Sequence, residues 1–253
     1  MNKILKEKYL PFLILGLGGI VMVMQWALVA KVDSKGLLPE THILYIMGWV
    51  LAVLSCGVTA AVVWKLNGPN RYNANFPASI PGTVGAFIMA LGIGASLLFH
   101  SQDMDGMTLA WQVLGILSIA ALFFTGICRM GGRRPAFFFH GVLCLFFALQ
   151  LVCRCRIWSS ETQVERYGFA LLASVGLMLA AYYRAAFDSG IGRRRMQLFV
   201  NLMTCFFCLA AVPGGGDPVL YLTGAVWTVT NLCVLTPPKR RRRPRPAPPP
   251  QES

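Results

Sequence analysis

Residues 168–187 have the sequence GFALLASVGLMLAAYYRAAF, and three consecutive arginines, Arg193 to Arg195, follow shortly after them. A helix rises about 1.5 Å per residue, so about 20 apolar residues cross a hydrocarbon layer about 30 Å thick. Hydrocarbon offers no hydrogen-bond partners to the backbone, and the alternating pattern of a membrane barrel is absent. The stretch therefore predicts a membrane-spanning helix that ends at a basic cytoplasmic loop.

Similar apolar stretches occupy most of the chain, of which 56% is hydrophobic and only 13% is charged. This composition is too apolar for an ordinary soluble domain. We expect an all-α fold, an integral membrane bundle of eight transmembrane helices over residues 1–236, with the first segment retained as a span. The predicted spans are residues 9–30, 43–64, 83–99, 109–128, 136–153, 168–187, 196–212 and 219–235. Residues 237–253 are predicted to form a disordered, basic, proline-rich tail.

Basic residues collect in every second gap between these spans. Of the 23 Lys and Arg residues, 18 fall on one side of the predicted membrane and 5 on the other. Because basic loops stay in the cytoplasm, both the N and C termini are predicted to be cytoplasmic. This sorting and the basic tail account for the net charge of +13, so nucleic acid is not an expected partner.

Two of the five residues that defy this sorting, Arg154 and Arg156, follow one another closely at the outer end of the fifth span. They have two interpretations. The arginines either anchor the helix against Glu161 and Glu165, or form an outward-facing site for an anion or an acidic substrate. Together with His100, this outer group contains the ionisable residues that a membrane enzyme would use at that interface.

Polar residues inside the predicted spans are mostly amides and hydroxyls. Gln112, Gln150 and Asn201 would either form hydrogen bonds between helices or line a substrate pathway. Arg184 and Asp188 are four residues apart near the inner end of the sixth span, and we expect them to form a structural ion pair. Small residues at four-residue spacing predict close helix packing and place the third and sixth spans inside the bundle. They are Ala86, Ala90 and Gly94 in the third span, and Gly176 and Ala180 in the sixth.

The tail carries six cations within seven residues, directly inside the last predicted span: Lys239, Arg240, Arg241, Arg242, Arg243 and Arg245. Each cation near a membrane surface contributes about 1 kcal/mol of attraction to anionic lipid. We expect contacts with anionic headgroups, and the same cluster would also fix the orientation of the last helix. A dedicated lipid or a membrane-protein partner is the alternative.

No catalytic or cofactor motif is present in the sequence. The chain has no Gly-x-Ser-x-Gly elbow, no His-Glu-x-x-His pair and no phosphate-binding Walker loop. The cysteines lie within or at the ends of apolar segments and lack the second ligand pair of a zinc site. We therefore expect no cofactor and no metal, and we assign no catalytic residue.

Three segments resemble a group of uncharacterised multi-pass membrane proteins of gut Firmicutes. They are Cys155-Arg-Ile-Trp158, Leu179-Ala-Ala-Tyr-Tyr-Arg-Ala-Ala-Phe-Asp188 and Val226-Trp-Thr-Val-Thr-Asn-Leu-Cys233. The resemblance extends from about Gly132 to Pro238, which is less than half of the chain. It implies a multi-pass protein of the bacterial cytoplasmic membrane and supplies no activity.

These observations favour a non-enzymatic membrane protein that acts as a partner or accessory subunit. A small-solute transporter is the first alternative, and it predicts a polar cavity near the middle of the membrane that Asn201, Gln112 or Gln150 lines. A membrane enzyme acting at the outer interface is the second. It predicts that the outer ionisable residues converge.

Overall fold

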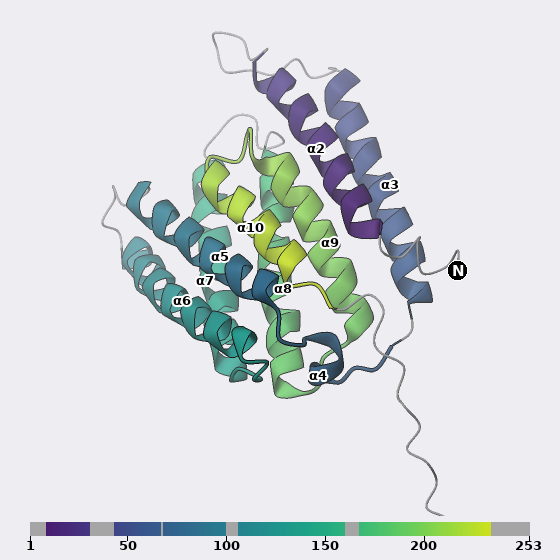
Figure 1. The fold of residues 1–253 in the computed structure, drawn as a ribbon. Helices are drawn as coiled ribbons and strands as arrows, with labels where there is room; N and C mark the ends of the chain where they lie inside the picture. The colour runs from purple at the N-terminus through teal and green to yellow at the C-terminus, as the bar shows by residue number, and fades with distance from the viewer. Residues whose placement is uncertain (1–8, 31–42, 67, 100–105, 160–166, 234–253) are drawn as a thin grey trace, which may run out of the picture.

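The computed structural model of the chain describes residues 9–30, 43–66, 68–99, 106–159 and 167–233. Within these ranges the regular structure is helical (Figure 1). The helices are α2 (Leu10–Val29), α3 (Ile43–Lys65), α4 (Tyr72–Asn75), α5 (Ile80–Phe99), α6 (Gly106–Met130), α7 (Phe137–Trp158), α8 (Gly168–Ser189), α9 (Arg194–Ala211) and α10 (Pro218–Thr230). The predicted basic tail lies outside the described residues.

Six of these helices, α2, α3 and α5 to α8, are 20 to 25 residues long and apolar enough to cross a membrane. The prediction of a helical multi-pass membrane protein is therefore confirmed. The remaining two predicted spans correspond to α9 and α10. Helix α9 has 18 residues but begins with Arg194 and Arg195, and α10 has only 13 residues.

Helices α5 to α10 form a closed ring in which each helix packs against the next and α10 packs against α5. The hairpin of α2 and α3 lies outside this ring and packs against α9, on the right of Figure 1. The sequence between the hairpin and the ring contains the turn-rich run Asn67-Gly-Pro-Asn70. Such a run of turn-forming residues is typical of a break between two packing units.

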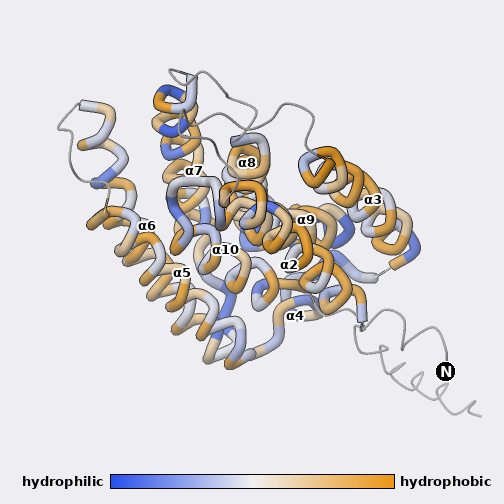
Figure 2. Tube along the Cα trace, turned by 90° about the horizontal axis from the view of Figure 1, so that it is seen from above, coloured by the Kyte–Doolittle hydropathy of each residue, from blue (hydrophilic) through white to orange (hydrophobic). Residues whose placement is uncertain are grey.

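Helix α9 is the most central element, since α2, α3, α8 and α10 all pack against it. Its polar residues Gln197, Asn201 and Thr204 are buried. By contrast, α2 and α3 expose large apolar side chains such as Trp26 and Val53, and Figure 2 shows apolar residues along the length of both helices. Such faces suit contact with lipid tails, whereas the polar face of α9 is shielded by neighbouring helices.

Glycines set the closest helix contacts. A Cβ on Gly85 would lie 2.8 Å from the Cβ of Thr230, and one on Gly92 would lie 2.7 Å from the Cβ of Thr223. The two contacts join α5 to α10. Small residues do mediate the packing of α5, as predicted, but Gly94 is the wrong glycine, because only Ile119 Cδ1 lies within 4 Å of a Cβ placed there.

On α8, Gly176 is a contact residue as predicted. A Cβ at this position would lie 2.6 Å from Thr204 Oγ1 on α9. Ala86, Ala90 and Ala180 are buried. The third and sixth predicted spans, α5 and α8, therefore do belong to the packed interior.

Two predicted boundaries and one missing helix require correction. The helix α10 in the last predicted span ends at Thr230 and not at 235, because Leu232 N–H bonds to the Val229 carbonyl and the chain leaves the α-helical hydrogen-bond pattern. The helix in the fifth predicted span continues from 153 to Trp158, so Arg154 and Arg156 belong to helix α7 itself. The short helix α4, between α3 and α5, was not predicted.

Candidate functional site

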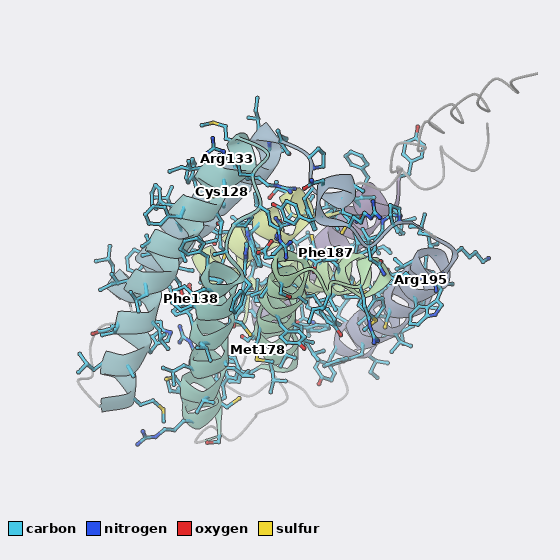
Figure 3. The ribbon with its side chains drawn as sticks, turned by 90° about the horizontal axis from the view of Figure 1, so that it is seen from below. Cys128, Arg133, Phe138, Met178, Phe187 and Arg195 are labelled. Carbon is cyan, nitrogen blue, oxygen red and sulfur yellow. The ribbon has the colours of Figure 1, made fainter. Side chains whose placement is uncertain are left out.

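A group of buried polar and aromatic residues lies where α4 meets the C-terminal ends of α6 and α8 and the N-terminal end of α7, at the end of the bundle that the sequence predicts to be cytoplasmic. We call this group the inner cluster. Its members are Tyr72, Phe76, Arg129, His140, Arg184 and Asp188. Figure 3 views the molecule from this end and shows Phe187, which packs against Phe76, near the centre of the bundle.

Asp188 is the carboxylate of the inner cluster. Its Oδ2 lies 2.6 Å from His140 Nδ1, and its Oδ1 lies 3.7 Å from Arg184 Nε. The Nε of Arg134 donates a hydrogen bond to the main-chain carbonyl of Asp188. Helix α8 ends at Ser189, and the next residue, Gly190, has the left-handed conformation (φ 94°) that is typical of a helix C-terminus. The predicted pair of Arg184 and Asp188 is thus a contact within a larger cluster.

Two aromatic residues hold the arginines of the cluster. The Phe76 ring centroid lies 3.6 Å from Arg184 Cζ and 4.8 Å from Arg129 Cζ, so two cations share one ring. Arg184 Nη2 donates to the Tyr72 hydroxyl at 3.2 Å, and that hydroxyl donates to the Arg133 carbonyl at 3.4 Å. Cation–π contacts of this kind contribute about 0.5–2 kcal/mol each.

The loop that contains α4 provides the Tyr72 and Phe76 side chains that contact Arg184. Asn75 Nδ2 donates to the carbonyls of Pro69 and Arg71, at 2.6 and 2.9 Å, and so closes the loop on itself. In the first turn of α5, a Cβ on Gly82 would lie 2.7 Å from Arg129 Nε, so a larger residue here would have to displace this side chain. Gly82 at the start of α5 therefore leaves space for the Arg129 guanidinium.

Positive charge exceeds negative charge in the inner cluster. Arg129 and Arg184 are only 6% and 2% exposed. Within the described residues, Asp188 is the only carboxylate that contacts either guanidinium. The Nε and Nη1 atoms of both arginines have no hydrogen-bond partner among these residues. A guanidinium stays protonated and carries five N–H donors, and burying it without partners costs free energy. The arrangement has the chemistry to bind an anion.

A second ionic group lies at the opposite end of the ring, which the sequence predicts to face outside. Arg154 Nη2 is 3.4 Å from Asp217 Oδ2, which also accepts a hydrogen bond from Ser96. Asp217 Oδ1 accepts from the Leu220 N–H at 3.2 Å and so caps the first turn of α10. The outer candidate Arg154 therefore has a partner that the sequence analysis missed.

The signal for this partner is present in the sequence. Asp217 directly precedes Pro218, and an Asp followed by a proline at the first helical position is a typical start of a helix. Arg156 is exposed on α7. The other outer candidates, His100, Glu161 and Glu165, lie outside the described residues.

The candidates for a substrate pathway occupy different surroundings. Gln150 and Asn201 are buried, and Asn201 Nδ2 donates to the Gln197 carbonyl of its own helix at 2.8 Å. Gln112 is half-buried and lines a pocket of about 400 Å³ with Leu97, Leu98 and other apolar residues of α5 and α6. Neither Gln150 nor Asn201 lines this pocket. Among the described residues, no group of three or more His, Cys, Asp and Glu side chains is placed to hold a metal ion.

Removal of the Asp217 carboxylate tests the outer ionic group. Asp217→Ala is expected to lower the free energy of unfolding by about 2 kcal/mol, because α10 loses its cap and Arg154 loses its counter-ion. Asp217→Asn should cost less, since the amide oxygen can still accept from Leu220 N–H. Detergent-titrated unfolding, followed by circular dichroism, measures both, with Arg156→Ala as the control at an exposed site. Equal losses for Ala and Asn would contradict the capping role.

Comparison with protein families, with curated proteins and with solved structures finds no match to this chain.

Proposed function

We propose that this multi-pass membrane protein is a non-enzymatic binding subunit that takes up an anionic group at the inner cluster. The observation that carries the proposal is the pair of buried arginines, Arg129 and Arg184, whose Nε and Nη1 atoms have no hydrogen-bond partner among the described residues. A carboxylate or phosphate oxygen between them would accept charge-assisted hydrogen bonds and offset the excess positive charge. Their rigid donor geometry favours such an anion over a neutral ligand.

The proposed setting is the bacterial cytoplasmic membrane, with eight spans and both termini in the cytoplasm. The distribution of Lys and Arg supports this orientation. The shielding of α9 by four other helices supports its role as a seventh span despite its polar residues, since it has little contact with lipid. The inner cluster then faces the cytoplasm, and the basic tail at 239–245 is proposed to contact anionic headgroups.

An anion transporter is the second candidate, because ionic groups lie at both ends of one helix ring, the inner cluster at one end and Arg154 with Asp217 at the other. The buried core between them favours the binding subunit. Leu177, Cys205 and Phe206 are fully buried in this region, and Asn201 bonds within its own helix. A transport pathway would require these helices to separate. The partner of a binding subunit is proposed to be another membrane protein that carries or senses the anion.

Anion-dependent stability tests the proposal. The melting temperature of the purified protein in neutral detergent is measured while phosphate or acetate is titrated. Because a ligand that binds only the folded state stabilises it by RT ln(1 + [L]/Kd), about 2.7 kcal/mol at 100-fold excess over Kd, the melting temperature should rise. Arg129→Gln should abolish this rise and, without added anion, should be more stable than the wild type, because it removes an uncompensated buried charge.

Arg133→Gln is the matched control, since its side chain is exposed at the same end of α6. It should retain the full anion-dependent rise. If Arg129→Gln and Arg133→Gln both respond like the wild type, the anion acts on the general surface charge and the proposed site is wrong. Arg184→Gln serves as an independent variant at the other arginine that contacts the Phe76 ring.

A further inference from the structure

A separate pocket lies between the inner end of α3 and the start of α9. Its volume is about 450 Å³, and it is open to the surroundings of the molecule. The residues that line it include Trp64, Gly68, Asn70, Arg193, Arg194 and Arg195. Figure 3 shows Arg195 beside α3, at the edge of the bundle and away from Phe187.

The lining of this pocket is strongly basic. Three consecutive arginines contribute to it. Arg193 and Arg195 are exposed, whereas Arg194 is only 1% exposed. A Cβ on Gly68 would lie 2.8 Å from Arg194 Cζ, so the absence of a side chain at Gly68 leaves space for this guanidinium. Asn70 Oδ1 accepts from the main-chain N–H of Arg194 at 3.2 Å and ties the loop to α9.

The position of the pocket relative to lipid follows from α3. Trp64 lies in the last turn of this apolar helix, is 56% exposed and is followed by Lys65. Exposed tryptophans next to basic residues are typical of the level of lipid headgroups. The mouth of the pocket is therefore placed where a headgroup phosphate of the cytoplasmic leaflet would lie, with the acyl chains along the exposed apolar face of α3.

We propose that this pocket binds the phosphate of an anionic phospholipid, with Arg193 and Arg195 as its main ligands and Arg194 as the inner wall. The guanidinium groups match the geometry of phosphate oxygens. Three arginines around one pocket favour a headgroup of net negative charge over a zwitterionic one. The site is distinct from the inner cluster and does not depend on its function.

Native mass spectrometry of the full chain tests the site. The protein is released from nanodiscs that contain equal amounts of phosphatidylglycerol and phosphatidylcholine with the same acyl chains, and the retained lipids are counted. The wild type should retain phosphatidylglycerol preferentially. Arg193→Gln/Arg195→Gln should lower this retention by about tenfold, because each cation near the surface contributes to the attraction. Both changed residues are exposed, so folding should be unaffected.

Arg71→Gln/Arg133→Gln removes the same charge from exposed positions outside the pocket and retains the basic tail. This control should stay within twofold of the wild type. Equal losses in both double variants, or equal retention of the two lipids by the wild type, would overturn the proposal. Displacement of the lipid by millimolar inorganic phosphate would assign the pocket to a soluble phosphate compound instead. Arg129→Gln should leave lipid retention unchanged, which separates this test from that of the inner cluster.

Discussion

Asp188→Asn is expected to lower the free energy of unfolding by about 3–5 kcal/mol, the usual cost of breaking a buried ion pair by removing one partner. The carboxylate is 4% exposed and lies against both His140 and Arg184. Its loss leaves the Arg184 guanidinium, itself 2% exposed, without a carboxylate contact in the described part of the chain. The uncompensated charge cannot reach water, so the folded state bears the full penalty.

Detergent-titrated unfolding of wild type and variant measures this loss. The informative control is the double variant Asp188→Asn/Arg184→Gln, because removing both members of a buried ion pair is often close to neutral. We expect the double variant to be more stable than Asp188→Asn alone. If the double variant loses as much stability as the sum of two single variants, the two residues act independently and the ion pair does not carry the effect.

The same residue shows how much of the inner cluster was predictable. The spacing of Arg184 and Asp188 on one helix identified their contact, because residues four apart on a helix are neighbours. His140, Arg129, Tyr72 and Phe76 come from three other elements, and no local pattern joins them. Their convergence follows from the closed ring of α5 to α10, which hydrophobic periodicity does not specify.

Long-range packing also explains the outer group. Within the described residues, Asp188 and Asp217 are the only carboxylates, and both are buried in ionic contacts. The sequence indicated Glu161 and Glu165, which are near Arg154 in the chain, as its partners. Asp217 lies 63 residues from Arg154, and the two meet because α7 and α10 start or end at the same side of the ring. The distribution of charged residues predicted that Arg154 and Asp217 lie on the same side of the membrane, but it did not predict their contact.

The helical class and the positions of most helices were predictable because the hydrocarbon layer imposes both length and backbone hydrogen bonding. The contacts between helices were harder to predict, because in lipid the packing of helix faces depends on the positions of small and polar residues. Four-residue spacing drew attention to Ala86, Ala90 and Gly94. Gly85 and Gly92, seven residues apart, are the positions at which α5 approaches α10.

Replacement of both glycines by leucine, Gly85→Leu/Gly92→Leu, is expected to destabilise the fold by about 2–6 kcal/mol, at about 1–3 kcal/mol for each overpacked site. Even a Cβ at these positions would lie within 3 Å of the Cβ of Thr230 or Thr223. The change would force α5 and α10 apart and open the ring. Detergent-titrated unfolding provides the measurement. Gly94→Leu on the same helix is the control, because it borders the apolar pocket beside α6 and should change stability by less than about 1 kcal/mol.

A double-mutant cycle distinguishes contact between the helices from an effect on α5 alone. Leucine is a better helix former than glycine by about 0.8–1 kcal/mol, so helix propensity by itself predicts stabilisation at both sites. If close approach decides the outcome, Thr223→Gly should recover part of the stability that Gly92→Leu removes, because it vacates the space that the new side chain needs. No recovery from this change, or from Thr230→Gly beside Gly85→Leu, would mean that the loss does not arise where α5 meets α10.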